Sequence, residues 1–385
     1  MILSFLSTLP AEAAQLRQSL RRQILTVNPE SFEPLALAVF RYQATHNFVY
    51  RQYLHYLKVQ PTQLTDLSRV PFMPIGFFKS HTILTGFDPA DEIPPDTLTF
   101  ASSGTTGQDT SRHFVLDPDL YDAVSTRIFE QTYGPLQNVH ILALLPSYLE
   151  RNNSSLVYMV QRFMAHGERS RSGYSGRTAD TTKNFFLNNL DELTDRLQQL
   201  TNHPDGKRIL LIGVTFALLD WAESGRDLGF LPRNPNLIVM ETGGMKGRRK
   251  ELLREEVHEL LTGRLSISPI HSEYGMTELL SQAYSVGEGV FRPSPTLRVF
   301  LRDINDPFQA IPHDRPETGG RRTGSRLTGE RRTGGINVVD LANLDSCSFI
   351  ETQDLGQYVG TAGDFRVIGR FDNSDVRGCN LLPGG

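Results

Sequence analysis

Hydroxyl and glycine residues are concentrated in one short stretch of the sequence, Ser102-Ser103-Gly104-Thr105-Thr106-Gly107. Glycine lets a backbone approach a ligand closely, and Ser and Thr add hydroxyl donors, so this composition suits a loop that holds phosphate groups. The stretch is not the P-loop of nucleoside triphosphatases, because no lysine follows and the spacing differs. A polar β-turn between an extended segment and a helix would have the same composition. Taken alone, the stretch fits both structures equally well.

Three later stretches follow the hydroxyl stretch in a meaningful order. They are Ser272-Glu273-Tyr274-Gly275-Met276-Thr277-Glu278, Thr352-Gln353-Asp354-Leu355-Gly356 and Ile368-Gly369-Arg370-Phe371-Asp372. Together the four stretches resemble the adenylate-forming superfamily, which includes acyl-CoA synthetases, luciferases and the adenylation domains of peptide synthetases. Those enzymes carry an SSGTTG loop, a YGxTE motif, an aspartate in a TGDLG-like motif and a GRxDD hinge. The resemblance implies the α/β fold of their large domain, with sheets flanked by helices and a β-rich subdomain.

The residue types in these stretches suit adenylation, in which a carboxylate attacks the α-phosphate of ATP and pyrophosphate leaves. Such an enzyme must hold the triphosphate, bind Mg²⁺ and keep the reactants in line. Glu278 offers a hard oxygen ligand for Mg²⁺, and Thr277 beside it can donate to the α-phosphate. Asp354 can accept from both ribose hydroxyls, and Arg370 could reinforce that end. Taken singly, Glu278 would also fit a solvated helix start, and Asp354 an Asx turn.

Within the superfamily, the sequence is similar to the LuxE-type acyl-protein synthetases, the fatty-acid-activating subunits of the bacterial luminescence fatty acid reductase. The resemblance implies that ATP and a fatty acid form an acyl-adenylate. The acyl group then passes to a cysteine near the C-terminus and onward to a reductase subunit or carrier protein. Apolar surface for an acyl chain is expected around Tyr148, Phe185, Phe186 and Trp221. Besides the motifs above, the similarity includes Pro71-Phe72-Met73-Pro74 with Phe78-Lys79, Leu145-Pro146-Ser147-Tyr148-Leu149-Glu150-Arg151 with Ser154-Ser155-Leu156, and Glu241-Thr242-Gly243-Gly244-Met245-Lys246-Gly247.

These similarities imply one set of site residues with ATP and Mg²⁺ as cofactors. Glu278 is the expected metal ligand. Gln353 is a minor departure from the motif pattern, because the wider superfamily has glycine at that position. The residues expected to take part in catalysis are Cys379, Thr277 and Lys246. Those expected to bind the nucleotide are Ser102, Ser103, Gly104, Thr105, Thr106, Gly107, Gly243, Gly244, Tyr274, Gly275, Asp354 and Arg370.

Cysteine and lysine are scarce in this chain, so few residues are candidates for the acyl acceptor or for a cation near the phosphates. Cys379 stands where the family has its acyl-accepting cysteine, although a cysteine so near a terminus could also be exposed and incidental. Cys347 lies in a stretch that predicts a strand and a buried thiol. No lysine follows Lys250, so Lys246, or else Lys79, is the cation expected near the phosphates. A surface role fits either of these lysines equally well.

The C-terminal part of the sequence is short for this superfamily. It ends 15 residues after Arg370, whereas typical acyl-CoA synthetases continue with a lid domain of roughly a hundred residues. We therefore expect the lid to be truncated, and with it the usual transfer to CoA. The alternatives are a ligase that passes another carboxylate to CoA or a carrier protein, and a catalytically silent scaffold. The presence of Thr277, Glu278 and Asp354 together argues against a silent site.

Helix and strand patterns alternate through the middle of the chain, as expected for an α/β sheet whose ligands gather at the carboxyl ends of its strands. Residues 10–60 predict two or three helices. Residues 69–79 contain two prolines and predict an extended linker with aromatic anchors, although Phe77, Phe78 and Lys79 could also border a site. The expected strands are 139–145, 208–214 and 237–241, and the expected helices are 119–133, 154–166, 187–200, 216–222 and 248–262.

Four regions are expected along the chain. They are an N-terminal helical region over 1–97, an α/β adenylate-binding core over 98–290, a β-rich subdomain over 291–368, and a hinge with a short tail over 369–385. Residues 313–335 contain an Arg/Gly/Thr array with a five-residue period, which predicts a disordered insertion. Such an Arg/Gly run can bind RNA, but it lacks interleaved aromatic residues. Short strands are expected at 297–301, 336–341, 348–350, 357–359 and 365–368.

The overall composition is that of an ordinary soluble protein, with 39% hydrophobic and 21% charged residues in a chain of 385. The formal net charge of −4 offers no argument for binding to nucleic acid or to a membrane surface. The apolar N-terminus has no basic region, so no signal peptide is expected, and no apolar run is long enough to span a bilayer. With two cysteines, the expected location is the reducing cytoplasm.

Overall fold

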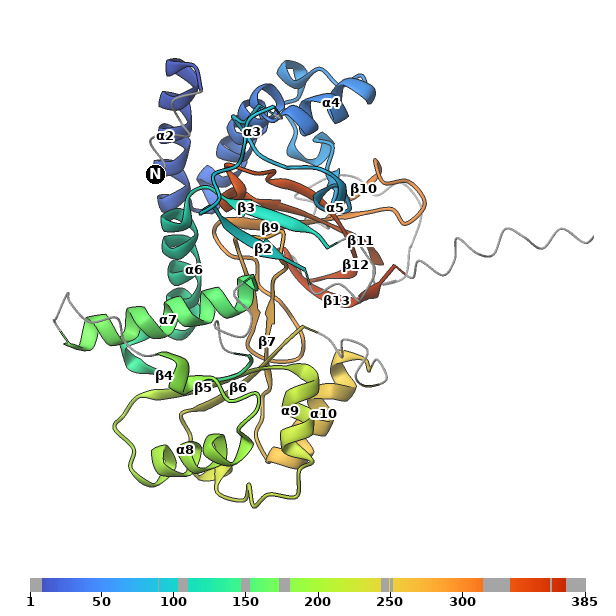
Figure 1. The fold of residues 1–385 in the computed structure, drawn as a ribbon. Coiled ribbons are helices and arrows are strands. Elements are labelled where there is room, and N and C mark those ends of the chain that lie inside the picture. Colours follow the sequence, from blue (N-terminus) through green and yellow to red (C-terminus); the bar gives the residue numbers. More distant parts are fainter. Residues whose placement is uncertain are drawn as a thin grey trace, which may run out of the picture.

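The computed structural model confirms the predicted α/β class. Helices flank a parallel sheet in one half of the molecule, and a β-rich sheet forms much of the other half (Figure 1). The structure describes residues 9–88, 90–102, 110–146, 153–172, 181–243, 249, 252–313, 333–360 and 362–371.

The parallel sheet has the order β4-β5-β6-β7-β8, in which the first four strands are parallel and β8 is antiparallel to β7. Almost every residue of β5 is buried, as expected for a strand covered on both faces. The carboxyl ends of β5, β6 and β7 therefore meet at one edge. The strands are β4 (Val139–Leu144), β5 (Arg208–Val214), β6 (Leu237–Thr242), β7 (His271–Tyr274) and β8 (Ala283–Ser285).

Four helices connect these strands. The predicted helix over 248–262 instead begins at Arg254, because the Glu256 carboxylate accepts from the Leu253 N–H at 2.7 Å and acidic residues occupy the first turn. The other three lie close to their predicted ranges, and α9 and α10 lie side by side (Figure 1). The helices are α7 (Ser155–Ser172), α8 (Leu190–Asn202), α9 (Thr215–Ala222) and α10 (Arg254–Leu265).

The β-rich sheet has the order β1-β12-β11-β9-β10, and β13 pairs with β12. The sequence predicts two short strands at 348–350 and 357–359, but β12 runs continuously between them and contains Asp354. The Asx turn considered for Asp354 is therefore wrong. β11 begins inside the predicted insertion, whose last three residues pair with β12. The strands are β1 (Met73–Pro74), β9 (Leu297–Arg302), β10 (Ala310–Ile311), β11 (Thr333–Asp340), β12 (Phe349–Val359) and β13 (Asp364–Arg370).

Three N-terminal helices, as expected, precede a hairpin and the helix α6. The buried Arg17 guanidinium joins Asp117, the N-cap of α6, to Asp345 in the β-rich half. The predicted linker over 69–79 contributes β1 and then turns into a short helix. These elements are α2 (Ala11–Thr26), α3 (Pro29–His46), α4 (Phe48–Tyr56), α5 (Phe77–Ser80), β2 (Leu98–Ala101), β3 (Arg112–Val115) and α6 (Pro118–Tyr133). Short 3₁₀ helices lie at Pro61–Gln63, Leu67–Arg69, Leu136–Asn138, Thr181–Asn184, Leu231–Arg233 and Leu341–Asn343.

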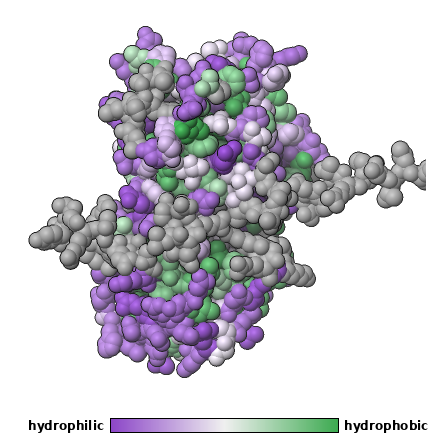
Figure 2. Space-filling view, viewed as in Figure 1, coloured by the Kyte–Doolittle hydropathy of each residue, from purple (hydrophilic) through white to green (hydrophobic). Residues whose placement is uncertain are grey.

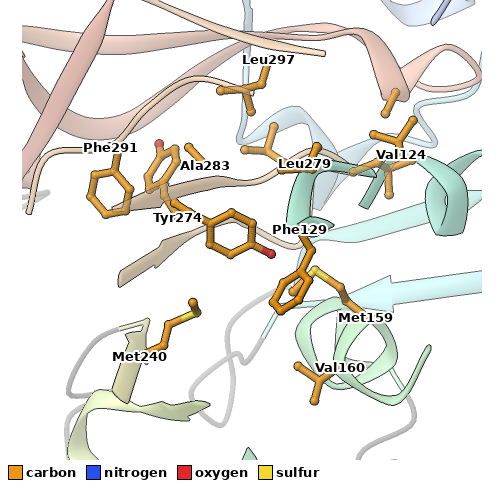
Figure 3. Close-up of a cluster of buried hydrophobic side chains, with 14 of the residues drawn as sticks. Val124, Phe129, Met159, Val160, Met240, Tyr274, Leu279, Ala283, Phe291 and Leu297 are labelled. Carbon is orange, nitrogen blue, oxygen red and sulfur yellow. The ribbon is translucent and has the colours of Figure 1, made fainter. Parts of the chain in front are cut away.

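A continuous apolar core joins the two halves, and side chains of α6, α7, β7 and β9 contribute to it (Figure 3). Cys347 is fully buried as predicted, but it lies in a turn before β12 rather than in a strand. Trp221 and Phe186 also belong to this core, and the Trp221 indole donates to the Thr194 hydroxyl at 3.1 Å. Phe186 also lines a pocket beside β4. The expectation that apolar surface around these aromatic residues receives an acyl chain stays a prediction.

None of the helices within the described residues is both long and apolar enough to cross a bilayer. On the face shown in Figure 2, hydrophilic residues cover most of the lower part, and apolar residues show mainly near the middle.

Candidate functional site

The last residue of β7 and the four residues after it, 274–278, form the centre of the candidate site and are called the site loop below. It leaves the carboxyl edge of the parallel sheet and turns toward the β-rich sheet. Its first residue, Tyr274, is buried against Phe291 and Phe365 with ring centroids 5.7 and 5.5 Å away (Figure 3 shows Tyr274 and Phe291). The Tyr274 hydroxyl donates to Asp354 Oδ2 at 3.1 Å. The loop is thereby joined to a residue 80 positions away.

Asp354 lies within β12, where the register pairs it with Arg370 on β13. The Arg370 Nε–H donates to Asp354 Oδ1 at 2.8 Å, so each carboxylate oxygen accepts one hydrogen bond from protein. A carboxylate oxygen has two lone-pair positions, which leaves capacity for further donors. The Asp354 backbone N–H donates to the Thr352 hydroxyl at 3.1 Å, so the preceding part of the motif helps to orient it.

Glu278 closes the site loop and is only 6% exposed. It lies in a turn, so the solvated helix start considered for it is wrong. Burial raises the pKa of its carboxyl, and hydrogen bonding from Ser111 and the positive charges of Arg370 and Lys79 oppose that rise. A buried hard oxygen ligand fits Mg²⁺ that takes its other ligands from phosphates and water. Within the described part of the chain, no three acidic, histidine or cysteine residues gather to form an all-protein metal cage.

Side chains from three other segments hold the backbone at the end of the site loop and at Leu280, two residues beyond it. His113 Nδ1 on β3 lies 2.9 Å from the Thr277 carbonyl, and Asn343 Nδ2 donates to the Glu278 carbonyl at 2.8 Å. Asp340 at the end of β11 accepts from the Leu280 N–H at 2.7 Å. Burial lowers the pKa of His113 to about 4, so the ring is neutral near pH 7 and its Nδ1 carries the proton. The C-terminal end of the loop is thus held at Thr277 and Glu278, and the chain just beyond it is held at Leu280.

Ser102 and Ser111 frame the hydroxyl stretch. The Ser111 N–H donates to Ser102 Oγ at 3.0 Å, and the Ser102 N–H donates to the Ser111 carbonyl at 3.1 Å. Because Ser111 also hydrogen-bonds to the Glu278 carboxyl group, Ser111 lies next to the site loop, and Ser102 is paired with it. Ser103, Gly104, Thr105, Thr106 and Gly107 lie outside the described residues.

The neighbouring strand end brings Gly243 to the same edge. Gly243 has a φ of 73°, which favours glycine, and its carbonyl lies 3.0 Å from the Thr215 hydroxyl at the end of β5. Gly244, Lys246 and Cys379 lie outside the described residues. The structure thus brings together Ser102, Gly243, Tyr274, Gly275, Thr277, Glu278, Asp354 and Arg370.

Sequence reasoning missed the residues that support this site. Ser111, His113, Asp340 and Asn343 belong to no recognisable motif, and their relation to the site loop arises only from folding. For Glu273 the sequence offers one signal of a supporting role, which is its position next to Tyr274 in a motif-like stretch.

Comparisons with known proteins found one kind of similarity. No protein-family model matches the sequence, and no curated protein is similar to it in sequence. The structure is similar to the crystal structure of a coronafacic acid ligase from Pectobacterium brasiliense, with a TM-score of 0.36 and 14% sequence identity. The similarity covers 65% of this chain and 43% of the ligase, so the chain spans less than half of that protein's length.

Proposed function

We propose that the protein is an adenylate-forming ligase that uses ATP and Mg²⁺ to activate a carboxylic acid. The observation that carries this proposal is the hydrogen bond from the Tyr274 hydroxyl to Asp354. It joins the YGxTE-like stretch to the aspartate stretch, and Arg370 of the third stretch pairs with the same carboxylate. Three segments that resemble one superfamily in sequence order therefore also lie side by side in space.

Each of these residues has a role in the proposed reaction. Asp354 accepts from the ribose hydroxyls of ATP, and Arg370 holds its carboxylate in place. Glu278 would hold Mg²⁺, which supplies charge neutralisation at the phosphates when bound. The Thr277 hydroxyl donates to the α-phosphate, and the donors of residues 102–107, Gly243 and Gly244 hold the nucleotide.

The finer assignment rests on sequence similarity to the acyl-protein synthetases. In it the carboxylic acid is a fatty acid, and the acyl group passes to Cys379 and then to a reductase or carrier-protein partner. Lys246 would supply a cation near the phosphates. The alternative is a ligase that passes a different carboxylate to CoA or a carrier protein.

A catalytically silent scaffold is the other alternative, and the burial of Glu278 disfavours it. A buried carboxyl group with a raised pKa destabilises the folded state relative to a neutral residue of similar size. Such a cost is typical of functional sites. A scaffold would gain nothing from retaining it.

The test is ATP–pyrophosphate exchange with a series of carboxylic acids that includes fatty acids of several lengths, aryl acids and amino acids. We expect exchange that requires Mg²⁺ and one class of acid, with fatty acids preferred. Exchange with aryl or amino acids alone would support the alternative ligase. The absence of exchange with every acid would contradict adenylation.

A further inference from the structure

We infer that Glu273 is a positioning residue for the site loop, and that residue 275 is glycine because the Glu273 carboxyl group occupies the space that a side chain there would need. The positioning of catalytic groups in this inference rests on the proposed adenylating function. The contact between residues 273 and 275 does not, and it can be tested separately.

The space beside Gly275 is filled by one chemical group. A Cβ atom added at Gly275 would lie 2.4 Å from Glu273 Oε1. The next nearest atoms are Cδ of the same carboxyl group at 3.4 Å and Gln282 Cγ at 3.8 Å, which are ordinary contact distances. Gly275 is not among the glycines with positive φ, so its backbone conformation does not require glycine. The Glu273 carboxyl group is therefore the reason that a side chain does not fit.

The Glu273 carboxyl group is held on its other side by the end of β6. The Thr242 hydroxyl donates to Glu273 Oε2, and the parallel register pairs these two residues directly. Both residues are buried, with exposed fractions of 4% for Thr242 and 5% for Glu273. Movement of the carboxyl group would break a buried hydrogen bond and leave an unpaired polar atom, which is costly. We call the Thr242–Glu273–Gly275 contact the latch.

Several charged and titratable groups face Glu273 from the surrounding elements. Burial is the largest effect and raises its pKa to about 7; Glu241 on β6 also raises it, while the Thr242 hydrogen bond and Arg254 on α10 lower it. Burial raises the pKa values of the phenols of Tyr121 and Tyr133 on α6 and of Tyr284 on β8, and the nearby charge of Glu273 raises them further. The latch thus lies in a buried polar cluster in which a small displacement has no compensating contact with water.

The latch acts on the two ends of the site loop. Tyr274 lies between Glu273 and Gly275, so a shift of either residue moves the Tyr274 hydroxyl, which donates to Asp354. Glu278 lies three residues after Gly275, so the same shift moves the proposed metal ligand. Displacement of about 1 Å at a catalytic centre can cost about a hundredfold in rate. Loss of the latch should therefore raise the KM for ATP and lower kcat together.

A double-mutant cycle tests the inference with Glu273→Ala, Gly275→Ala and the double variant. Each single change should raise the KM for ATP in pyrophosphate exchange by roughly fivefold to tenfold or more. In the double variant the methyl group at 275 no longer meets a carboxyl group. The double variant should therefore lose no more exchange activity and no more thermal stability than Glu273→Ala alone.

Two controls separate positioning from a general loss of stability. Gly263→Ala on α10 adds a methyl group where nothing lies within 4 Å. It should neither raise the KM for ATP nor lower the melting temperature. Glu273→Gln keeps the shape and the acceptor for Thr242, so it should restore a near-parental KM. Partial unfolding would lower kcat and leave the KM for ATP unchanged, which a lost latch would not do.

Additive losses in the double variant, or a harmless Gly275→Ala, would overturn the inference. If the parental protein showed no exchange with any acid, the proposed function and the catalytic role of the latch would both fail. The coupling measured by thermal unfolding would then still decide whether residues 273 and 275 share the space described here.

Discussion

At the scale of single residues, Asp354 links the parts of the candidate site that lie farthest apart in sequence. It accepts from Tyr274 on the parallel sheet and from Arg370 on β13, the strand that pairs directly with β12. Each donor contacts a different carboxylate oxygen, so together they fix the orientation of the carboxylate. The remaining lone pairs are what the proposal assigns to the ribose.

Removing one of these donors should weaken ATP binding without unfolding the protein. Hydrogen bonds to charged groups contribute about 1.5–3 kcal/mol, so Tyr274→Phe should raise the KM for ATP by roughly tenfold. The ring and its packing remain, so the melting temperature should fall by no more than the loss of one hydrogen bond implies, and the protein should stay folded in the assay. Tyr53→Phe is the matched control, because its hydroxyl donates to the Phe72 carbonyl. An equal effect of the two substitutions on KM would contradict the assignment.

Glu278→Gln should lower pyrophosphate exchange by about a hundredfold, the loss typical when one group that stabilises transition-state charge is removed. Because burial raises the pKa of this carboxyl, the neutral amide should not lower the melting temperature. Glu351→Gln replaces a half-buried glutamate that also has a raised pKa; it is the control and should retain activity. Near-parental exchange in Glu278→Gln would remove it from the site.

The same pKa shift predicts a pH dependence. A protonated Glu278 cannot bind Mg²⁺, so exchange should fall as the pH decreases through the raised pKa. For folding the sign is opposite, because the native state holds the proton to a higher pH than the unfolded chain. Glu278 should therefore contribute less stability as the pH rises from the unfolded pKa to the folded one. Glu278→Gln should remove this part of the pH dependence of the melting temperature.

At the scale of helices and strands, sequence patterns predict what is apolar and periodic. β5 is a continuous run of buried apolar residues, and its predicted range of 208–214 matches the structure. The sequence predicts β12 only in two pieces, because Thr352, Gln353 and Asp354 interrupt its apolar pattern. In the structure these polar residues find partners on distant elements: Arg302 donates to the Thr352 carbonyl at 2.8 Å, and Tyr274 donates to Asp354. A single sequence does not reveal such partners.

The boundary of the Arg/Gly/Thr array gives a prediction at this scale. Thr333, Gly334 and Gly335 pair with Gln357, Gly356 and Leu355 of β12. Deleting residues 318–332 should leave the melting temperature and activity nearly unchanged, because the closure free energy depends weakly on loop length. After this deletion, the residues that remain must still connect β10 to β11, which pair with opposite edges of β9 and lie about 10 Å apart.

Extending the deletion to Gly335 is the matched comparison. The longer deletion removes the three residues of β11 that pair with β12 beside Asp354. It also moves another residue into the place of Gly335, where an added Cβ atom would lie within 2.8 Å of three atoms of the Arg302 guanidinium. Deleting 318–335 should therefore lower the melting temperature clearly more than deleting 318–332. Equal melting temperatures would show that the end of β11 contributes little.

At the scale of the whole molecule, the candidate site lies between the two sheets. Contacts that cross this boundary include the bridge between Phe291 and Phe365 and the Arg254 guanidinium, 3.4 Å from the Val367 carbonyl. The order of motifs along the chain predicts Tyr274, Glu278, Asp354 and Arg370. It does not predict His113 or Asn343, because they support the loop through carbonyl contacts that leave no pattern in sequence.

The fate of the acyl group is the last question at this scale, and the two cysteines distinguish the possible answers. Burial raises the pKa of the Cys347 thiol to about 12, so almost no thiolate exists near pH 7 and the group is enclosed in the core. Since the thiolate is the nucleophile, Cys347 is unsuited to accept an acyl group. Cys379 is then the candidate acceptor in the proposed acyl-protein synthetase.

With labelled fatty acid, ATP and Mg²⁺, the parental protein should acquire a label that hydroxylamine releases, as expected for a thioester. Cys379→Ser should still catalyse pyrophosphate exchange but carry no such label, because adenylation precedes the transfer. Cys347→Ser should label normally, although it replaces a buried thiol that lies 3.5 Å from the Phe349 carbonyl and should unfold at a lower temperature. Undiminished label on Cys379→Ser would remove the covalent step and leave an adenylate-forming enzyme with a separate acceptor.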